Sequence, residues 1–165
     1  MSALGLAALE ICRRELLAGV HGGDPVRFRS PPIDAYKLAI GRDPDVAEPW
    51  CADAMCWALL KAFGTSPLGV TGVGVPPRTA SCRALWHWTL AAQTQEAAPG
   101  RIFILDRGEH WHCGIIDMVT GPRLLTIEGD TNAAGSSTGD AWGSHDWDPS
   151  EGTRGRLVGY LEFGA

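Results

Sequence analysis

Hydrophobic residues in the first half of the chain recur at helical spacing. The pattern predicts helices at residues 3–18, 33–40, about 50–63 and 83–90. A glycine ends each of the first three helices, and Thr79 or Ser81 caps the fourth. The segments between them, above all 20–32 and 65–78, are rich in glycine and proline and are predicted to be loops.

The second half of the chain has a different pattern. After the Pro99-Gly100 step, short β-prone runs are separated by turn residues, at 102–105, 113–118, 123–128 and 157–163. No strand is predicted in the Gly-rich stretch 133–153. Helices followed by an antiparallel meander indicate an α+β fold, in which N-terminal helices pack on a C-terminal antiparallel β-sheet.

Length and charge narrow the possible functions. A chain of 165 residues fits one domain, 1–165, and 45% hydrophobic residues suffice for a folded core. The net charge of −5, without a basic cluster, argues against nucleic acid and anionic membranes as partners. The apolar runs are shorter than the roughly 20 residues of a membrane helix, so no membrane insertion is expected. Because Arg13 and Arg14 follow the first apolar run, no signal peptide is predicted, and we expect synthesis in the cytoplasm.

One of the five cysteines lies at a position that favours reactivity. Five cysteines at irregular spacing argue against a disulfide framework. Proline suits the first position of a helix, so Pro49 would place Cys51 in the first turn. Free N–H groups and the helix dipole favour a thiolate there. The alternative is an ordinary buried thiol, a common state of free cysteine.

A histidine and a carboxylate are predicted to meet on the sheet. Residues 112–118 and 123–128 form a predicted hairpin, and a turn centred near Thr120 would set His112 opposite Glu128, on the same face. With Cys51, these residues make up a nucleophile, a base and a group that orients the base.

Three segments carry more specific information. They are Pro49-Trp50-Cys51-Ala52, His112-Cys113-Gly114-Ile115-Ile116 and Thr126-Ile127-Glu128-Gly129-Asp130-Thr131-Asn132. In this order they resemble the core motifs of CHAP domains (cysteine, histidine-dependent amidohydrolases/peptidases), which belong to the papain-like peptidoglycan hydrolases. The resemblance spans about residues 45–162 and includes the basic stretch Arg154–Arg156. It implies a single papain-like catalytic domain with peptidoglycan as its partner.

The resemblance also implies a role for each matching residue. Cys51 attacks the amide carbonyl, His112 transfers the proton, and the Cys51 N–H forms half of an oxyanion hole. Either Glu128 or Asp130 orients the imidazole. Asp130 departs from the family pattern, because related proteins often have asparagine at that position. The residues assigned to substrate binding are Trp50, His110, Trp111 and Asn132.

A metal site is the main chemical alternative. His110, His112, Cys51, Cys56 and Cys113 offer soft ligands. However, no C-x-x-C pair is present, and strand alternation sets Cys113 on the face opposite to His112. We therefore expect no metal and no cofactor.

Three functions remain open. The first is a hydrolase that cleaves peptidoglycan amides, as an N-acetylmuramoyl-L-alanine amidase or an endopeptidase. Its setting would be that of a phage or prophage endolysin, acting as a monomer on the cell wall or in the periplasm. The second is a contact-delivered antibacterial toxin with the same chemistry and an immunity protein as partner. The third is a catalytically silent papain-like binding module, in which Cys51 would keep an ordinary thiol pKa of about 8.5.

Overall fold

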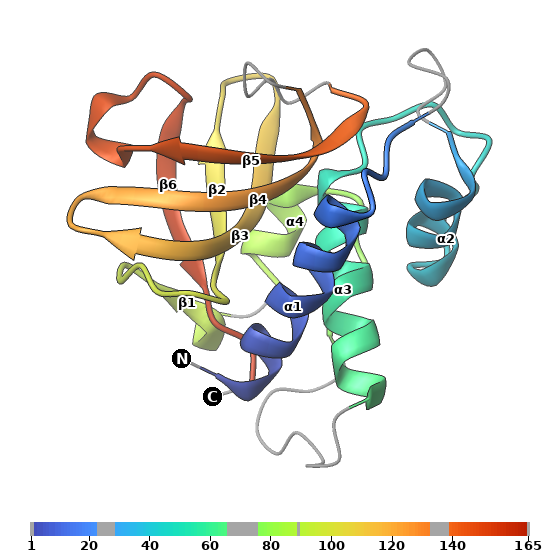
Figure 1. Ribbon diagram of the computed structural model, residues 1–165, viewed down its shortest axis with the longest axis horizontal. Coiled ribbons are helices and arrows are strands. Elements are labelled where there is room, and N and C mark those ends of the chain that lie inside the picture. Colours follow the sequence, from blue (N-terminus) through green and yellow to red (C-terminus); the bar gives the residue numbers. More distant parts are fainter. Residues whose placement is uncertain (1, 23–28, 66–75, 89, 133–138, 165) are drawn as a thin grey trace.

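Helices form the first half of the chain and strands the second, which confirms the predicted α+β fold (Figure 1). The computed structural model describes residues 2–22, 29–65, 76–88, 90–132 and 139–164. The α-helices are α1 (Ala3–Leu17), α2 (Pro31–Ala39), α3 (Cys51–Thr65) and α4 (Cys82–Trp86). The strands are β1 (Gln93–Thr94), β2 (Ile102–Asp106), β3 (Trp111–Thr120), β4 (Arg123–Thr131), β5 (Ala141–Trp147) and β6 (Arg156–Leu161). Short 3₁₀ helices are η1 (Leu90–Ala92) and η2 (Pro149–Glu151).

Local residue chemistry sets the ends of the helices. α2 begins at Pro31, two residues earlier than predicted, because the missing N–H of proline costs nothing in a first turn. Ser81 caps α4 by accepting a hydrogen bond from the Ala84 amide at 3.2 Å, but α4 ends at Trp86, earlier than predicted. α3 continues past Gly64, so the predicted stop there is wrong. Within the described ranges, no helix combines the length and the apolar character needed to cross a bilayer.

The strands form one antiparallel sheet in the order β1-β6-β2-β3-β4-β5. β5 lies in the Gly-rich stretch where no strand was predicted, and it pairs with β4 along most of its length. β3 and β4 form the predicted hairpin, but the turn falls at Gly121-Pro122, and Ile115 pairs with Ile127. At Ile115 and Ile116 the register is therefore displaced by two residues from the predicted one, and between the bulge at Ile116/Met118 and the turn it is displaced by three.

The helices gather on one side of the sheet (Figure 1). α1 and α3 pack on each other, and α3 also contacts β3 and β4. The larger apolar core lies between these helices and the sheet, with Met55, Leu59, Ile104 and Ile115 among its buried residues. A smaller core contains the side chains that alternate to the other face: Phe103, Leu105, Ile116, Leu124, Trp147 and Tyr160. β3 thus contributes residues to both cores.

Candidate active site

Cys51 is the first residue of α3 and lines a pocket of about 350 Å³. The Ala54 amide donates to the Trp50 carbonyl at 3.0 Å, so Trp50 is the cap of the helix. The sequence had suggested Pro49 as the first helical residue. In the structure Pro49 instead precedes the cap, and this prediction is wrong. The consequence for Cys51 is unchanged, because its own N–H has no partner inside the helix and its side chain lies at the positive end of the dipole.

A buried histidine–carboxylate pair lies next to this helix end. His112 Nε2 donates to Glu128 Oε2 at 2.9 Å, and both side chains are fully buried. The other ring nitrogen, Nδ1, makes no standard hydrogen bond, and the imidazole interacts with the Cys51 thiol. The three side chains therefore lie in the order expected of a nucleophile, a base and an orienting group.

Two further side chains hold Glu128. Arg154 donates to both of its carboxylate oxygens, at 2.6 and 2.8 Å, and the Thr126 hydroxyl donates to Oε1 at 2.6 Å. Although burial opposes ionisation, the hydrogen bonds from His112 and Arg154 hold the pKa of Glu128 well below its usual range. Sequence analysis did not assign Arg154 or Thr126 to the site, and the only signal was that both lie in segments that resemble the family.

The displaced register explains how His112 and Glu128 meet. Continued past Ile115 and Ile127, the β3–β4 pairing sets Glu128 opposite Gly114 rather than opposite His112. The side chain of Glu128 then passes over Gly114, where an added Cβ would lie only 2.7 Å from Glu128 Cγ. Because a shift of two residues preserves the face of a strand, the two side chains still lie on the same side.

Asp130 does not contact the imidazole through a hydrogen bond. Its backbone has a φ of 59°, in the left-handed region, so its side chain leaves the regular alternation of β4. The carboxyl group is fully buried, and its oxygens make no hydrogen bond of standard geometry within the described residues, although the Trp50 backbone N–H lies close enough to favour the charged form. Burial raises the pKa of Asp130 to about 8, so the group is protonated at neutral pH. Of the two candidate carboxylates, Glu128 is the one that contacts His112.

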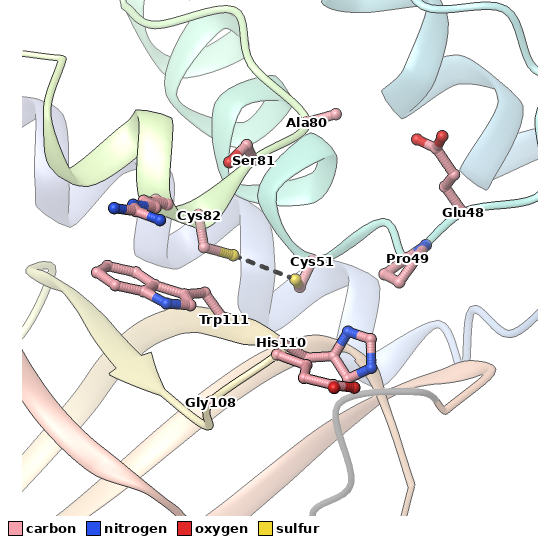
Figure 2. Close-up of a pocket in the computed structure, with 11 residues that line it drawn as sticks. Glu48, Pro49, Cys51, Ala80, Ser81, Cys82, Gly108, His110 and Trp111 are labelled. Carbon is pink, nitrogen blue, oxygen red and sulfur yellow. Dashed lines mark hydrogen bonds between the residues drawn. The ribbon is translucent and has the colours of Figure 1, made fainter.

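Two more thiols lie against Cys51. The sulfur of Cys82, at the start of α4, is 3.4 Å from Cys51 Sγ, and the two point toward each other in Figure 2. The sulfurs of Cys51, Cys82 and Cys113 all lie within 4.8 Å of one another. Cys113 and His112 alternate along β3 as predicted, yet both interact with Cys51, so the inference that alternation removes Cys113 from the site is wrong. Sequence analysis also missed Cys82, and it offered Cys56, which lies outside this cluster.

The local electrostatics favour a thiolate at Cys51 only. Contacts with the Cys113 and Cys82 thiols, and then with His112, lower the pKa of Cys51 well below its usual value despite burial. Burial raises the pKa of Cys113 well above its usual value. Contact with Cys113 lowers the pKa of Cys82, but contact with Cys51 and burial prevail and raise it well above its usual value. Burial also disfavours the His112 imidazolium, but the interactions with Cys51 and Glu128 raise the pKa of His112 to about 9.

The pocket beside Cys51 receives two of the four residues assigned to substrate binding. His110 and Trp111 line it (Figure 2). Arg83 lines it as well, and its guanidinium lies 5.8 Å from the centre of the Trp111 ring. Trp50 is fully buried, and its ring packs against an aromatic cluster in the helix-side core, so its side chain does not face the pocket. Asn132 is exposed and does not line this pocket.

Among proteins of known structure, Ly7917 has a fold similar to that of this chain. No family model matches the chain, and no curated protein matches it. The crystal structure of Ly7917 superposes with a TM-score of 0.53 at 16% identity, covering 95% of this chain and 61% of that one. Ly7917 with the hydrolyzing product of MDP gives a TM-score of 0.53 at 18% identity, covering 98% and 63%. This chain therefore spans less than two thirds of the length of Ly7917, and the two share a fold.

Proposed function

We propose that this chain is a cysteine amidohydrolase or peptidase that cleaves amide bonds in peptidoglycan. The observation that carries the proposal is the Cys51 thiol at the start of α3, in contact with the buried His112–Glu128 pair. The fold relative Ly7917 was solved with the hydrolyzing product of MDP, a peptidoglycan fragment, and this supports the substrate class. The CHAP assignment rests on the three sequence motifs, and the role of a phage-type lysis enzyme is the biological setting that we propose for this activity.

In the first half of the proposed reaction, the Cys51 thiolate attacks the carbonyl carbon of the amide. The N–H of Cys51, which has no partner inside the helix, is directed to the oxygen on which negative charge develops. As the C–N bond breaks, the protonated His112 gives its Nδ1 proton to the departing amine, leaving a thioester on Cys51.

In the second half, neutral His112 accepts a proton from a water molecule that attacks the thioester. The carboxyl product leaves, and the Cys51 thiolate and the His112 imidazolium are restored. Glu128 fixes the ring through Nε2 in both halves, so that Nδ1 always faces the reacting atoms. Arg154 and Thr126 keep Glu128 charged and stationary.

The direct test is digestion of purified sacculi by the wild-type protein, Cys51→Ala and Cys56→Ala. Cys56 is a matched control, because it is a buried cysteine of the same helix whose thiol donates to the Thr79 carbonyl, away from the cluster. We expect wild type and Cys56→Ala to release new amino groups without new reducing ends, and Cys51→Ala to release neither.

Mass spectrometry of the fragments identifies the bond. Stem peptides freed from the sugar would indicate an amidase, and glycan-bound peptides of reduced length would indicate an endopeptidase. Activity in Cys51→Ala equal to wild type, or reducing ends in place of amino groups, would refute the proposal. Alkylation of Cys51 as a function of pH separates the enzyme from a silent binding module, because the module predicts an ordinary thiol pKa of about 8.5.

A further inference from the structure

The Cys51–Cys82–Cys113 thiol cluster contains more sulfur than the proposed hydrolysis uses. The three residues come from α3, α4 and β3, segments far apart in the sequence, and all three are buried. Hydrolysis needs one nucleophilic sulfur, yet the three sulfurs lie within 4.8 Å of one another. A role for Cys82 and Cys113 is therefore left unassigned.

The spacing of the three sulfurs suits a tetrahedral metal ion. Zinc–sulfur bonds are about 2.3 Å long, so two thiolates on a tetrahedral zinc lie about 3.8 Å apart. In this structure the Cys51 and Cys82 sulfurs are 3.4 Å apart, and no sulfur pair of the cluster exceeds 4.8 Å. Movements of well under 1 Å at each of these cysteine side chains would bring the three sulfurs to this spacing.

The imidazole of His112, beside Cys51, is the candidate fourth ligand, although its nitrogens do not lie within 4.8 Å of all three sulfurs and the ring would have to move toward them. His112 interacts with Cys51, its Nδ1 makes no standard hydrogen bond, and its Nε2 donates to Glu128. A metal-bound histidine typically donates its other N–H to a carboxylate, which fixes the ring and increases its basicity. Glu128, held by Arg154, supplies this outer partner.

The cluster is also accessible. Cys51 and Cys82 line the pocket of about 350 Å³, and Glu48 lines it too (Figure 2). Glu109 and Arg83 also belong to its lining. Acidic groups in the lining of a pocket raise the local concentration of cations. Three thiolates and an imidazole select soft or borderline ions such as Zn²⁺ or Cd²⁺ over Mg²⁺ and Ca²⁺, which prefer oxygen ligands.

We propose that Cys51, Cys82, Cys113 and His112 form a binding site for a single thiophilic divalent cation of the Zn²⁺ class. Binding forms three metal–sulfur bonds and one metal–nitrogen bond, and the protons carried by Cys82, Cys113 and His112 Nδ1 pass to water. Metal binding itself does not depend on the hydrolase assignment. Its consequence does: because the ion occupies both nucleophile and base, it reversibly inhibits the proposed hydrolysis.

The test uses full-length protein freed of metal by chelator and reductant, then titrated with Cd²⁺ and, separately, with Zn²⁺ against a chromophoric chelator. We expect one ion per chain and an ultraviolet thiolate-to-cadmium charge-transfer band. Cys82→Ala and Cys113→Ala should each weaken binding by at least about 10–100-fold, the loss typical of disturbing even an outer-shell group. Cys56→Ala, which leaves the cluster intact, should bind as wild type does.

Other outcomes overturn the site. Equal affinity in wild type and the Cys82→Ala/Cys113→Ala double variant would show that any bound ion sits elsewhere. Formation of a Cys51–Cys82 disulfide under aerobic conditions, with no stoichiometric metal in the reduced protein, would make the cluster a redox pair instead. Because the readout is spectroscopic, inactivity on peptidoglycan leaves this result unaffected. If the protein is active, chelator should restore the activity of the zinc-treated enzyme.

Discussion

Replacing Glu128 by glutamine tests the hydrogen-bond network that we assign to the orientation of His112. The carboxylate accepts bonds from His112, Thr126 and twice from Arg154. A glutamine has one carbonyl oxygen and one amide NH₂ group, so it cannot accept all of these bonds. If its NH₂ group faces the imidazole, the ring is held in the tautomer that carries its proton on Nδ1, and His112 can no longer accept a proton from the attacking water.

The expected losses of stability and turnover in Glu128→Gln follow from the burial and the charge of its surroundings. Glu128 is fully buried and the Arg154 side chain is 11% exposed, so the substitution removes the negative charge that faces a nearly buried guanidinium. Breaking such a pair from one side costs about 3–5 kcal/mol of unfolding free energy. For turnover, loss of an oriented general acid–base group corresponds to a decrease of about 10²–10⁴-fold in kcat. We therefore expect Glu128→Gln to be less stable than wild type but still folded enough for its turnover to be measured. Its activity should fall much more than its folded fraction.

The assay is kcat/KM on one defined muropeptide, with the folded fraction of each sample measured by urea unfolding. Glu162→Gln is the matched control, because Glu162 pairs with Arg101 at 2.6 Å away from the site. If Glu128→Gln proves too unstable, the double variant Glu128→Gln/Arg154→Met removes the buried positive charge as well and keeps the test of turnover. Near-wild-type turnover of Glu128→Gln, or a greater loss in Asp130→Asn, would refute the assignment of Glu128.

Three further predictions follow from the same geometry. kcat/KM should hold through neutral pH and fall as pH rises through about 9, where His112 loses the proton that it gives to the leaving amine; a pH–rate profile measures this. Gly114→Ala should cost about 1–3 kcal/mol in urea unfolding, because its Cβ would meet Glu128 Cγ at 2.7 Å, whereas Gly64→Ala, in open space on α3, should gain about 0.5–1 kcal/mol. Asp130 keeps its proton to about pH 8 when folded but ionises near pH 4 when unfolded, so the folded state binds the extra proton in this window. Wild-type stability should therefore fall relative to Asp130→Asn as pH rises from about 4 to 8; equal slopes would contradict the protonated state.

The helices and four of the strands were predictable because their signals are local. Apolar spacing, capping residues and β-prone runs need no knowledge of distant segments. β5 lacks such a signal: its sequence, Ala141–Trp147, contains Gly143 and polar residues, and it becomes a strand by pairing with β4. The preference of a segment for the sheet depends on its neighbours, so sequence propensity alone did not identify it.

In the candidate site, too, some features could be predicted from local sequence signals, and others depend on segments that are distant in the chain. The contact between His112 and Glu128 survived a register error of two residues, because an even displacement keeps both side chains on one face. Cys82 lies 31 residues from Cys51 in the chain, and Arg154 lies 26 residues from Glu128. No periodicity of the sequence links the members of either pair. The left-handed backbone of Asp130, which takes its side chain off the pleat, has no sequence signal either, because only a minority of Asp residues adopt it.

Charge balance explains why the site tolerates an aspartate where related proteins often have asparagine. The positive groups of the buried centre, His112, Arg154 and Arg107, already interact with the Cys51 thiolate and Glu128. Burial and the nearby Cys51 thiolate disfavour a further negative charge at Asp130, and a buried group in such surroundings is neutralised by protonation. Asp130 satisfies this requirement by keeping its proton up to about pH 8, so at neutral pH it presents the site with an uncharged group, as asparagine would. The same balance bears on the thiol cluster, because a second thiolate there needs a compensating positive charge, which a divalent cation supplies.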